Sequence, residues 1–410
     1  MATTLLEPGG DATFNVASLT AGGMWYGVGN SPTVVTDFVH GTHQRSIKFA
    51  AGSNQFVASR NGVFADAGSR LSFWYYNVAN PNATASICLI QDFDGANTVF
   101  SLRLTSAGVI QIWNGQSTGQ IGTDGATIST GRWTRISLAY TITSTTINRF
   151  ELFVDGTSSI SITNATLTRT GTTLWNPGNA ETNATLDMRW SDLYVDDSSS
   201  LTDPGEIWVT AKRPFANGTA NNFTTQIGAG GSGYGTGHAP QVNERALSTT
   251  NGWSMVGAGS AVTEEYTIEG ASVGDIDITN FEIVDYGGWL YQGSLVSETA
   301  TMVTGGSSST YATGTSANMI TSFRGSTTYP AGGTDIGMIT STDLTTVSLY
   351  ECGIMVAYIP SVPLADGFAI LREDGGQVLV ETNDVLLLES GDAATTTETI
   401  PTLLTMGVGI

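Results

Sequence analysis

The chain has 410 residues and a formal net charge of −21 at pH 7, from 15 Lys and Arg against 36 Asp and Glu. Cations this sparse exclude a basic nucleic-acid-binding surface, and the acidity keeps the chain away from anionic surfaces. Charged residues make up only 12% while 50 residues are glycine, a polar, turn-rich composition typical of β proteins of more than one domain.

The amino terminus lacks the basic and apolar regions of a signal peptide, and no apolar run reaches the ~18 residues that span a membrane. We therefore expect synthesis in a cytoplasm and no membrane insertion.

Residues 12–209 consist of short β-rich runs separated by Gly, Asn, Asp and Ser, which is typical of an all-β sandwich. In "RFELFVDGTSSISI", at 149–162, apolar residues alternate before Asp155 and Gly156. This pattern predicts a strand, a tight hairpin turn and a returning strand.

The segment "MRWSDLYVDD", at 188–197, places an aspartate among aromatic residues. In an uninterrupted strand Met188, Trp190, Asp192 and Tyr194 share one face. A buried carboxylate needs hydrogen-bond donors, so we expect backbone or Arg groups to surround Asp192.

The composition shifts to Gly, Asn and Thr at about 211–240, which predicts a linker or long loop, and strand-like runs resume from 241 to 360. Cys88 and Cys352 each lie inside an apolar run. Because a bridge would join two different predicted domains, we expect two buried free thiols.

The tail contains an eight-residue pattern repeated at 370–377, 378–385 and 386–393. Such a small meander cannot bury its own apolar edge, so it is expected to pack on another chain or to fold back on its own second domain. The apolar residues predicted to mediate assembly are Ile370, Leu371, Val378, Leu379, Val380, Leu386, Leu387 and Leu388.

Residues suited to catalysis are few. The three histidines are His40, His43 and His238, so no cluster of three His or Cys ligands predicts zinc, and no Gly-x-Ser-x-Gly motif predicts a hydrolase. Local carboxylate pairs lie near predicted strand ends, where solvated charges are expected, and we predict no catalytic residue. These pairs are Asp196 and Asp197, Glu264 and Glu265, and Asp275 and Asp277.

Two segments are candidates for ligand binding. Asp92, Asp94 and Asn97 surround a Gly with a spacing similar to a calcium loop, although the closing Glu is missing and a hairpin turn is the alternative. Trp113 and Asn114 are the candidate carbohydrate-binding residues, since an exposed aromatic ring can stack on a sugar, although a Trp at a strand end is more often in the core.

A family resemblance rests on four stretches that resemble strands of laminin-G-like, concanavalin A-like jelly rolls. They are "RLSFWYYN" at 70–77, "VFSLRLTSAGVIQIWNG" at 99–115, "GRWTRISLAYTITSTTINRFELFVDGTSS" at 131–159 and "WSDLYVDD" at 190–197. The resemblance covers residues 12–209. The acidic strand motif of the glycosidases of this superfold is missing, so their catalysis does not transfer.

The resemblance, the strand-like runs after residue 241 and the tail repeat together predict an all-β fold in three parts. We expect a concanavalin A-like jelly-roll sandwich at 1–212, a second β-sandwich at 213–361 and a short C-terminal β-meander at 362–410. This order of parts resembles structural proteins of tailed bacteriophages.

That second resemblance implies a non-enzymatic virion structural protein of a tail, neck or head fibre, without a cofactor. Its expected partners are further copies of itself, as a trimer, and other virion proteins. The alternative is a lectin-like protein that recognises a host surface glycan, which is an inference by fold analogy.

Overall fold

The computed structural model describes the chain in segments. They are 3–9, 25–29, 32–52, 55–59, 63–92, 97–143, 146–169, 171–172, 174–181, 185–229, 235–243, 249–256, 262–274, 276–294, 299–304, 307–312, 318–340 and 346–360.

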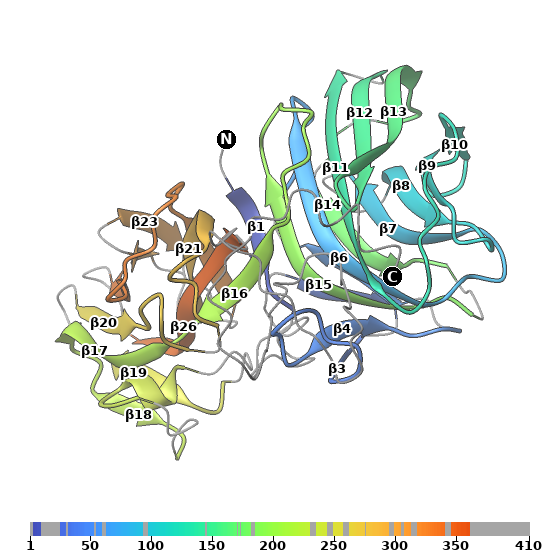
Figure 1. Cartoon of the computed structure of the whole chain (residues 1–410). Helices are drawn as coiled ribbons and strands as arrows, with labels where there is room; N and C mark the ends of the chain where they lie inside the picture. The colour runs from blue at the N-terminus through green and yellow to red at the C-terminus, as the bar shows by residue number, and fades with distance from the viewer. Residues whose placement is uncertain are drawn as a thin grey trace, which may run out of the picture. The chain divides into compact units, whose positions relative to one another are not determined.

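The described residues form an all-β protein with four antiparallel sheets (Figure 1). A short 3-10 helix, η1 (Ala239–Gln241), accompanies them. None of the described residues forms a helix long and apolar enough to cross a membrane. The predicted all-β class is therefore confirmed.

The first two sheets contain the strands up to residue 196. The eight-stranded sheet has the order β13-β12-β11-β6-β15-β4-β3, with β1 also paired to β15. Its strands are β1 (Thr3–Glu7), β3 (Thr33–Val35), β4 (Ser46–Phe49), β6 (Ser69–Ala79), β11 (Trp133–Thr143), β12 (Thr146–Val154), β13 (Thr157–Thr166) and β15 (Asp187–Asp196).

The seven-stranded sheet faces it with the order β10-β9-β8-β7-β14-β5-β2. Its strands are β2 (Trp25–Gly29), β5 (Gln55–Ser59), β7 (Ala85–Gln91), β8 (Thr98–Leu104), β9 (Ile110–Asn114), β10 (Gly119–Ile121) and β14 (Leu174–Asn179).

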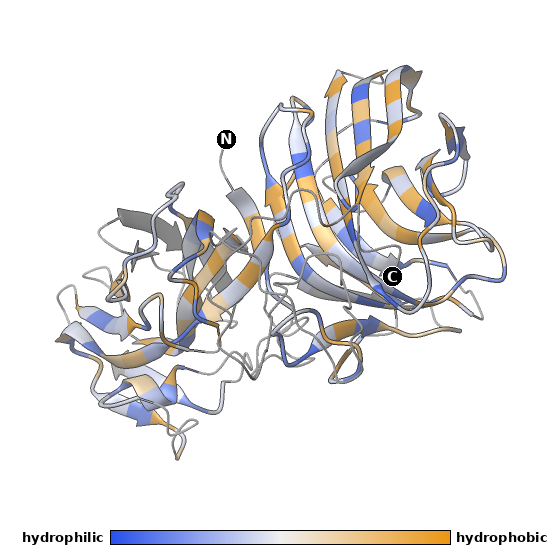
Figure 2. Ribbon diagram, viewed as in Figure 1, coloured by the Kyte–Doolittle hydropathy of each residue, from blue (hydrophilic) through white to orange (hydrophobic). Residues whose placement is uncertain are grey.

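The two sheets enclose one hydrophobic core. Apolar and polar residues alternate along their strands, as the banded colouring in Figure 2 shows. The alternation lets each strand bury every second side chain between the sheets. Trp175 and Trp190 lie 5.9 Å apart in this core, between their ring centroids, and Phe73 stacks on Trp190 at 3.8 Å.

The predicted hairpin is present. β12 and β13 pair around Asp155 and Gly156, whose φ angles are 49° and 78°. Positive φ at both central positions is the geometry of a type I′ turn, which matches the twist of the flanking strands.

β15 departs from the uninterrupted strand predicted for this segment. The pairing of β15 with β6 shifts register between Ser191 and Tyr194, and Asp192 has a φ of 51°. Because a bulge reverses which face later side chains take, Leu193 follows Trp190 into the core. Asp192 and Tyr194 therefore do not share the face of Trp190, and that prediction was wrong.

The second pair of sheets contains the strands from residue 208 onward. The six-stranded sheet has the order β18-β19-β26-β21-β24, with β16 also paired to β26, and the five-stranded sheet has the order β17-β20-β25-β22-β23. The strands are β16 (Trp208–Lys212), β17 (Pro214–Asn221), β18 (Thr225–Ile227), β19 (Gly252–Val256), β20 (Thr263–Ile268), β21 (Glu282–Ser294), β22 (Thr299–Thr304), β23 (Ser307–Ala312), β24 (Asn318–Phe323), β25 (Asp335–Thr340) and β26 (Thr346–Ile359).

These sheets enclose a second hydrophobic core, which includes Tyr266, Leu290 and Ile354. β16 falls inside the range 1–212 predicted for the first domain, yet it pairs with β26 of the second pair of sheets. Both cysteines are buried free thiols, one in each core, as predicted.

The tail predicted to mediate assembly, at 362–410, lies outside the described residues. The β-meander, its eight apolar residues and the trimer therefore stay predictions.

Candidate functional site

The outer face of the seven-stranded sheet, turned away from the core, is unusually polar. Along β8 the side chains of Phe100, Leu102 and Leu104 enter the core, so Ser101 and Arg103 point outward. Along β9 the side chains of Ile110 and Ile112 pack in the core, so Gln111 and Trp113 lie on the outer face.

Strand pairing arranges these side chains in two rows across the sheet. Arg103 pairs with Ser86 of β7 on one side and with Gln111 of β9 on the other. The second row is adjacent and runs through five strands. Its members, in order, are Asn176, Leu89, Ser101, Trp113 and Gln120.

We call these two rows, together with Asn179, Gln91, Gln116 and Glu181, the outer polar face. Many of its polar side chains are buried, since Ser86 and Ser101 are 0% exposed, Asn176 is 1% exposed and Arg103 is 4% exposed. Polar groups this deeply buried need partners inside the structure.

Arg103 is the centre of the outer polar face. Its terminal nitrogens donate to the Glu181 carboxylate at 2.5 and 2.9 Å. They also donate to the carbonyl oxygens of Gln116 and Thr84. The guanidinium carbon lies 5.1 Å from the ring centroid of Trp113, a cation–π distance.

Three buried atoms of this face have no hydrogen-bond partner among the described contacts. They are Nε of Arg103, Oδ1 of Asn176 and Nδ2 of Asn179. An unpaired buried polar atom costs about 1–3 kcal/mol, so each is a place where an internal water would be expected. Two are donors and one is an acceptor.

Trp113 is half-buried on the outer polar face and is absent from the core. Its Nε1 donates to Oε1 of Gln111 at 2.9 Å, and Gln111 in turn donates to Asp124 at 2.5 Å. This chain of hydrogen bonds fixes the orientation of the ring. The carbohydrate role of Trp113 stays a prediction.

The other candidate residues have local partners. Oδ1 of Asn114 accepts hydrogen bonds from the backbone and hydroxyl of Thr168, both at 3.1 Å. Asp92 accepts hydrogen bonds from the backbone and side chain of Asn97, as in a closed turn, while Asp94 lies outside the described residues. The carbohydrate role of Asn114 and the calcium site stay predictions.

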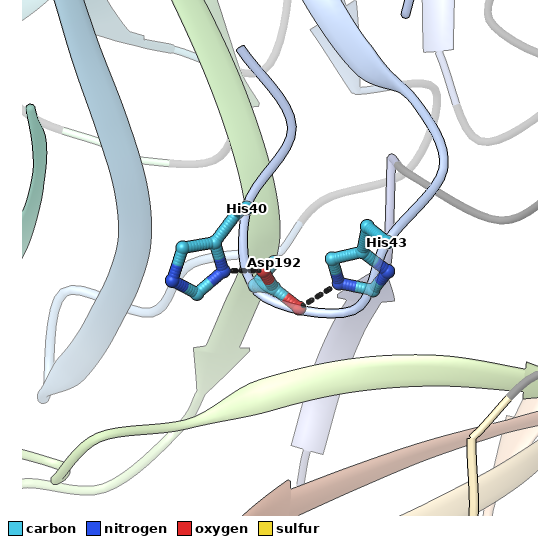
Figure 3. Close-up of side chains that lie close together, drawn as sticks. All are labelled: His40, His43 and Asp192. Atoms are coloured by element: carbon cyan, nitrogen blue, oxygen red, sulfur yellow. Dashed lines mark hydrogen bonds and ion pairs between the residues drawn. The ribbon is translucent and has the colours of Figure 1, made fainter. Parts of the chain in front are cut away.

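A second cluster joins His40, His43 and Asp192 (Figure 3). Nδ1 of His40 and Nε2 of His43 each lie 2.7 Å from a carboxylate oxygen of Asp192, and the rings approach it from opposite sides. The backbone nitrogen of Val209 donates to the same carboxylate at 2.7 Å. Asp192 thus accepts from histidines and backbone, whereas backbone or Arg donors were expected.

The local sequence explains why the two histidines converge. Gly41, between them, has a φ of 52°, and a Cβ at this position would lie 2.2 Å from the ring of Trp208. Only glycine fits there. The ring of His40 also stacks on Trp74 at 4.1 Å, so its orientation is fixed.

The electrostatics of this cluster favour an ionised carboxylate. Burial by itself would raise the pKa of Asp192, but His43 and His40 outweigh it and hold that pKa well below its ordinary value. The three side chains are the one group of three or more in the described part of the chain whose metal-ligand atoms converge, within 4.8 Å. Two ligands of one zinc lie roughly 3.3 Å apart, so contacts of 2.7 Å make this a hydrogen-bonded triad.

No protein-family model and no curated protein matches the sequence. Among solved structures, the endo-β-1,4-glucuronan lyase of the fungus Trichoderma reesei is 15% identical with a TM-score of 0.32, covering 43% of this chain and 90% of that one. Domain 4 of an extracellular arabinanase from Geobacillus stearothermophilus is 14% identical with a TM-score of 0.34, covering 49% and 96%. A Trypanosoma rangeli sialidase is 11% identical with a TM-score of 0.30. The match covers 40% of this chain and only 26% of that protein.

These matches contradict the prediction of a non-enzymatic virion structural protein. The matched proteins named here are a lyase, an arabinanase domain and a sialidase, and none is a structural protein of a virion, so the virion and non-enzyme predictions are contradicted by these comparisons and are not carried further. The shared feature is a jelly-roll-like β-sandwich. At these scores the likeness carries no argument about the substrate or activity of this chain.

Proposed function

We propose that the outer polar face of the seven-stranded sheet binds carbohydrate. The observation that carries this proposal is the arrangement around Trp113, in which an oriented, half-buried indole adjoins a row of amides, hydroxyls and one guanidinium. Protein sites for sugars need an apolar ring face for the C–H groups and neighbouring polar groups for the hydroxyls.

The accessible amides of the outer polar face support the same ligand. A sugar hydroxyl both donates and accepts a hydrogen bond. It can therefore pair with the amide groups of Gln116, which is half-buried, and of Gln120, which is exposed. The lectin-like alternative drawn from the sequence is thus the function that the geometry favours.

The test is retention of the full chain on a panel of polysaccharides in affinity gel electrophoresis. Trp113→Ala removes the stacking ring and should weaken binding about tenfold, which corresponds to ~1.4 kcal/mol. The matched control is Phe38→Ala, because Phe38 is an exposed ring (44%) in the loop after β3 of the other sheet.

The control variant should bind like the original chain. Loss of binding in both variants, or no retention of the original chain by any polysaccharide, would refute the proposal. The same incubations are analysed for newly released reducing ends, which detects cleavage of a bound polysaccharide.

A further inference from the structure

The charge of the outer polar face narrows the ligand class, and this inference rests on the proposed function. We propose that the bound carbohydrate is uncharged, a glycan of neutral sugars rather than one of uronic or sialic acids. The inference rests on the charged groups of the sheet, on their pairing, and on the neutral side chains that surround them.

The seven strands of this sheet carry a single charged residue. Their sequences are WYGVG, QFVAS, ASICLIQ, TVFSLRL, IQIWN, GQI and LWNPGN, in which Arg103 is the only Asp, Glu, Lys or Arg. A site for repeated carboxylates requires several cations, typically Arg in a two-pronged arrangement. The strands supply one.

That one cation is already neutralised. Both terminal nitrogens of Arg103 donate to Glu181, and its remaining terminal N–H groups bond the carbonyls of Gln116 and Thr84. A further carboxylate adjoins the same face, because Asp124 accepts hydrogen bonds from Gln111 and Gln120. The face therefore has a net negative charge, which repels an acidic ligand.

The neighbouring side chains of the face give a further reason. The surrounding side chains are themselves neutral amides and hydroxyls, namely Gln91, Gln111, Gln116, Gln120, Asn179, Ser86 and Ser101.

The experiment compares the full chain on a neutral polysaccharide series, composed of glucan, xylan and arabinan, with a polyuronate series of matched length, at low and high salt. We expect at least tenfold tighter retention by one of the neutral polymers, and little change of that retention with salt. Equal or tighter retention by a polyuronate at low salt would overturn the inference while leaving carbohydrate binding intact. Retention by neither series would refute the proposed function itself.

Two variants test the electrostatic cause. Glu181→Gln removes the carboxylate that neutralises Arg103 and should raise the ratio of polyuronate to neutral retention at least fivefold. Asp197→Asn makes the same charge change at an exposed position after β15 and should leave the ratio unchanged. An equal response of both variants would show that overall charge, rather than this face, sets the preference.

Discussion

Replacement of Asp192 by alanine should destabilise the protein strongly, because one carboxylate holds three segments together. Asp192 is 0% exposed and accepts hydrogen bonds from His40, His43 and the backbone of Val209 at 2.7 Å each. The variant leaves three buried donors without an acceptor. Each unpaired donor costs about 1–3 kcal/mol, and relaxation with entry of water limits the measured loss to ~3–5 kcal/mol.

This loss is a large fraction of the ~5–15 kcal/mol that stabilises an ordinary domain, and it corresponds to a fall in melting temperature of about 6–20 °C. The assay is urea unfolding followed by tryptophan fluorescence, with Asp197→Ala, an exposed carboxylate five residues along, as the matched control. A loss below about 1 kcal/mol for Asp192→Ala would refute the reasoning, since the triad would then contribute no more than a surface contact.

The pH dependence follows from the lowered pKa of Asp192. Because the folded state binds the proton more weakly than the unfolded state, whose ordinary value is 3.8, the stabilisation is present above that pH. It is lost as the pH falls through the lower folded pKa. The difference in stability between the original chain and Asp192→Ala should therefore be largest near neutral pH and shrink in strong acid.

Three further predictions concern single residues. Lys212→Met should destabilise the second pair of sheets by ~1–3 kcal/mol in urea unfolding, because the buried Nζ donates to three backbone carbonyls, those of Ala271, Val273 and Ile276. The control Lys48→Met, at a half-buried position, should change the free energy of unfolding by less than about 0.5 kcal/mol. Burial raises the pKa of Cys88 to about 12 and that of Cys352 well above its ordinary value. A thiol reagent at pH 8 should therefore react with both cysteines only after unfolding, and fast reaction of the native chain would contradict their burial. Gly156→Ala forces a Cβ onto a residue at φ 78° and should cost about 1–2 kcal/mol by thermal unfolding; an unchanged melting temperature would show that the turn relaxes.

Local signals were sufficient to predict the strands and the hairpin. The turn at Asp155 and Gly156 is specified by two adjacent residues, and the alternation around it follows from a period of two. The burial of Cys88 and Cys352 was likewise predictable from the apolar runs around them.

The bulge in β15 and the histidine triad could not be predicted in this way. The bulge is defined by the pairing of β15 with β6, which are more than 100 residues apart in sequence. The triad joins a loop at 40–43 to Asp192 across a similar gap. A signal was nevertheless present, since an aspartate among aromatic residues and two histidines three positions apart each required a partner.

The outer polar face lies between these two cases. Its Trp113 was selected from the sequence as a candidate, but the rows across β14, β7, β8 and β9 depend on strand register, which the sequence of one strand does not contain. The role of Arg103 and its pairing with Glu181 were missed for the same reason.

The most direct test of the account is isothermal titration of the full chain, and of its Trp113→Ala variant, with the neutral oligosaccharide whose polymer is retained best. The account predicts saturable binding by the original chain and about tenfold weaker binding by the variant, with the melting temperature of both proteins unchanged in the absence of ligand. Equal affinity of the two proteins would show that the sugar binds elsewhere and would contradict the assignment of the outer polar face as the binding site.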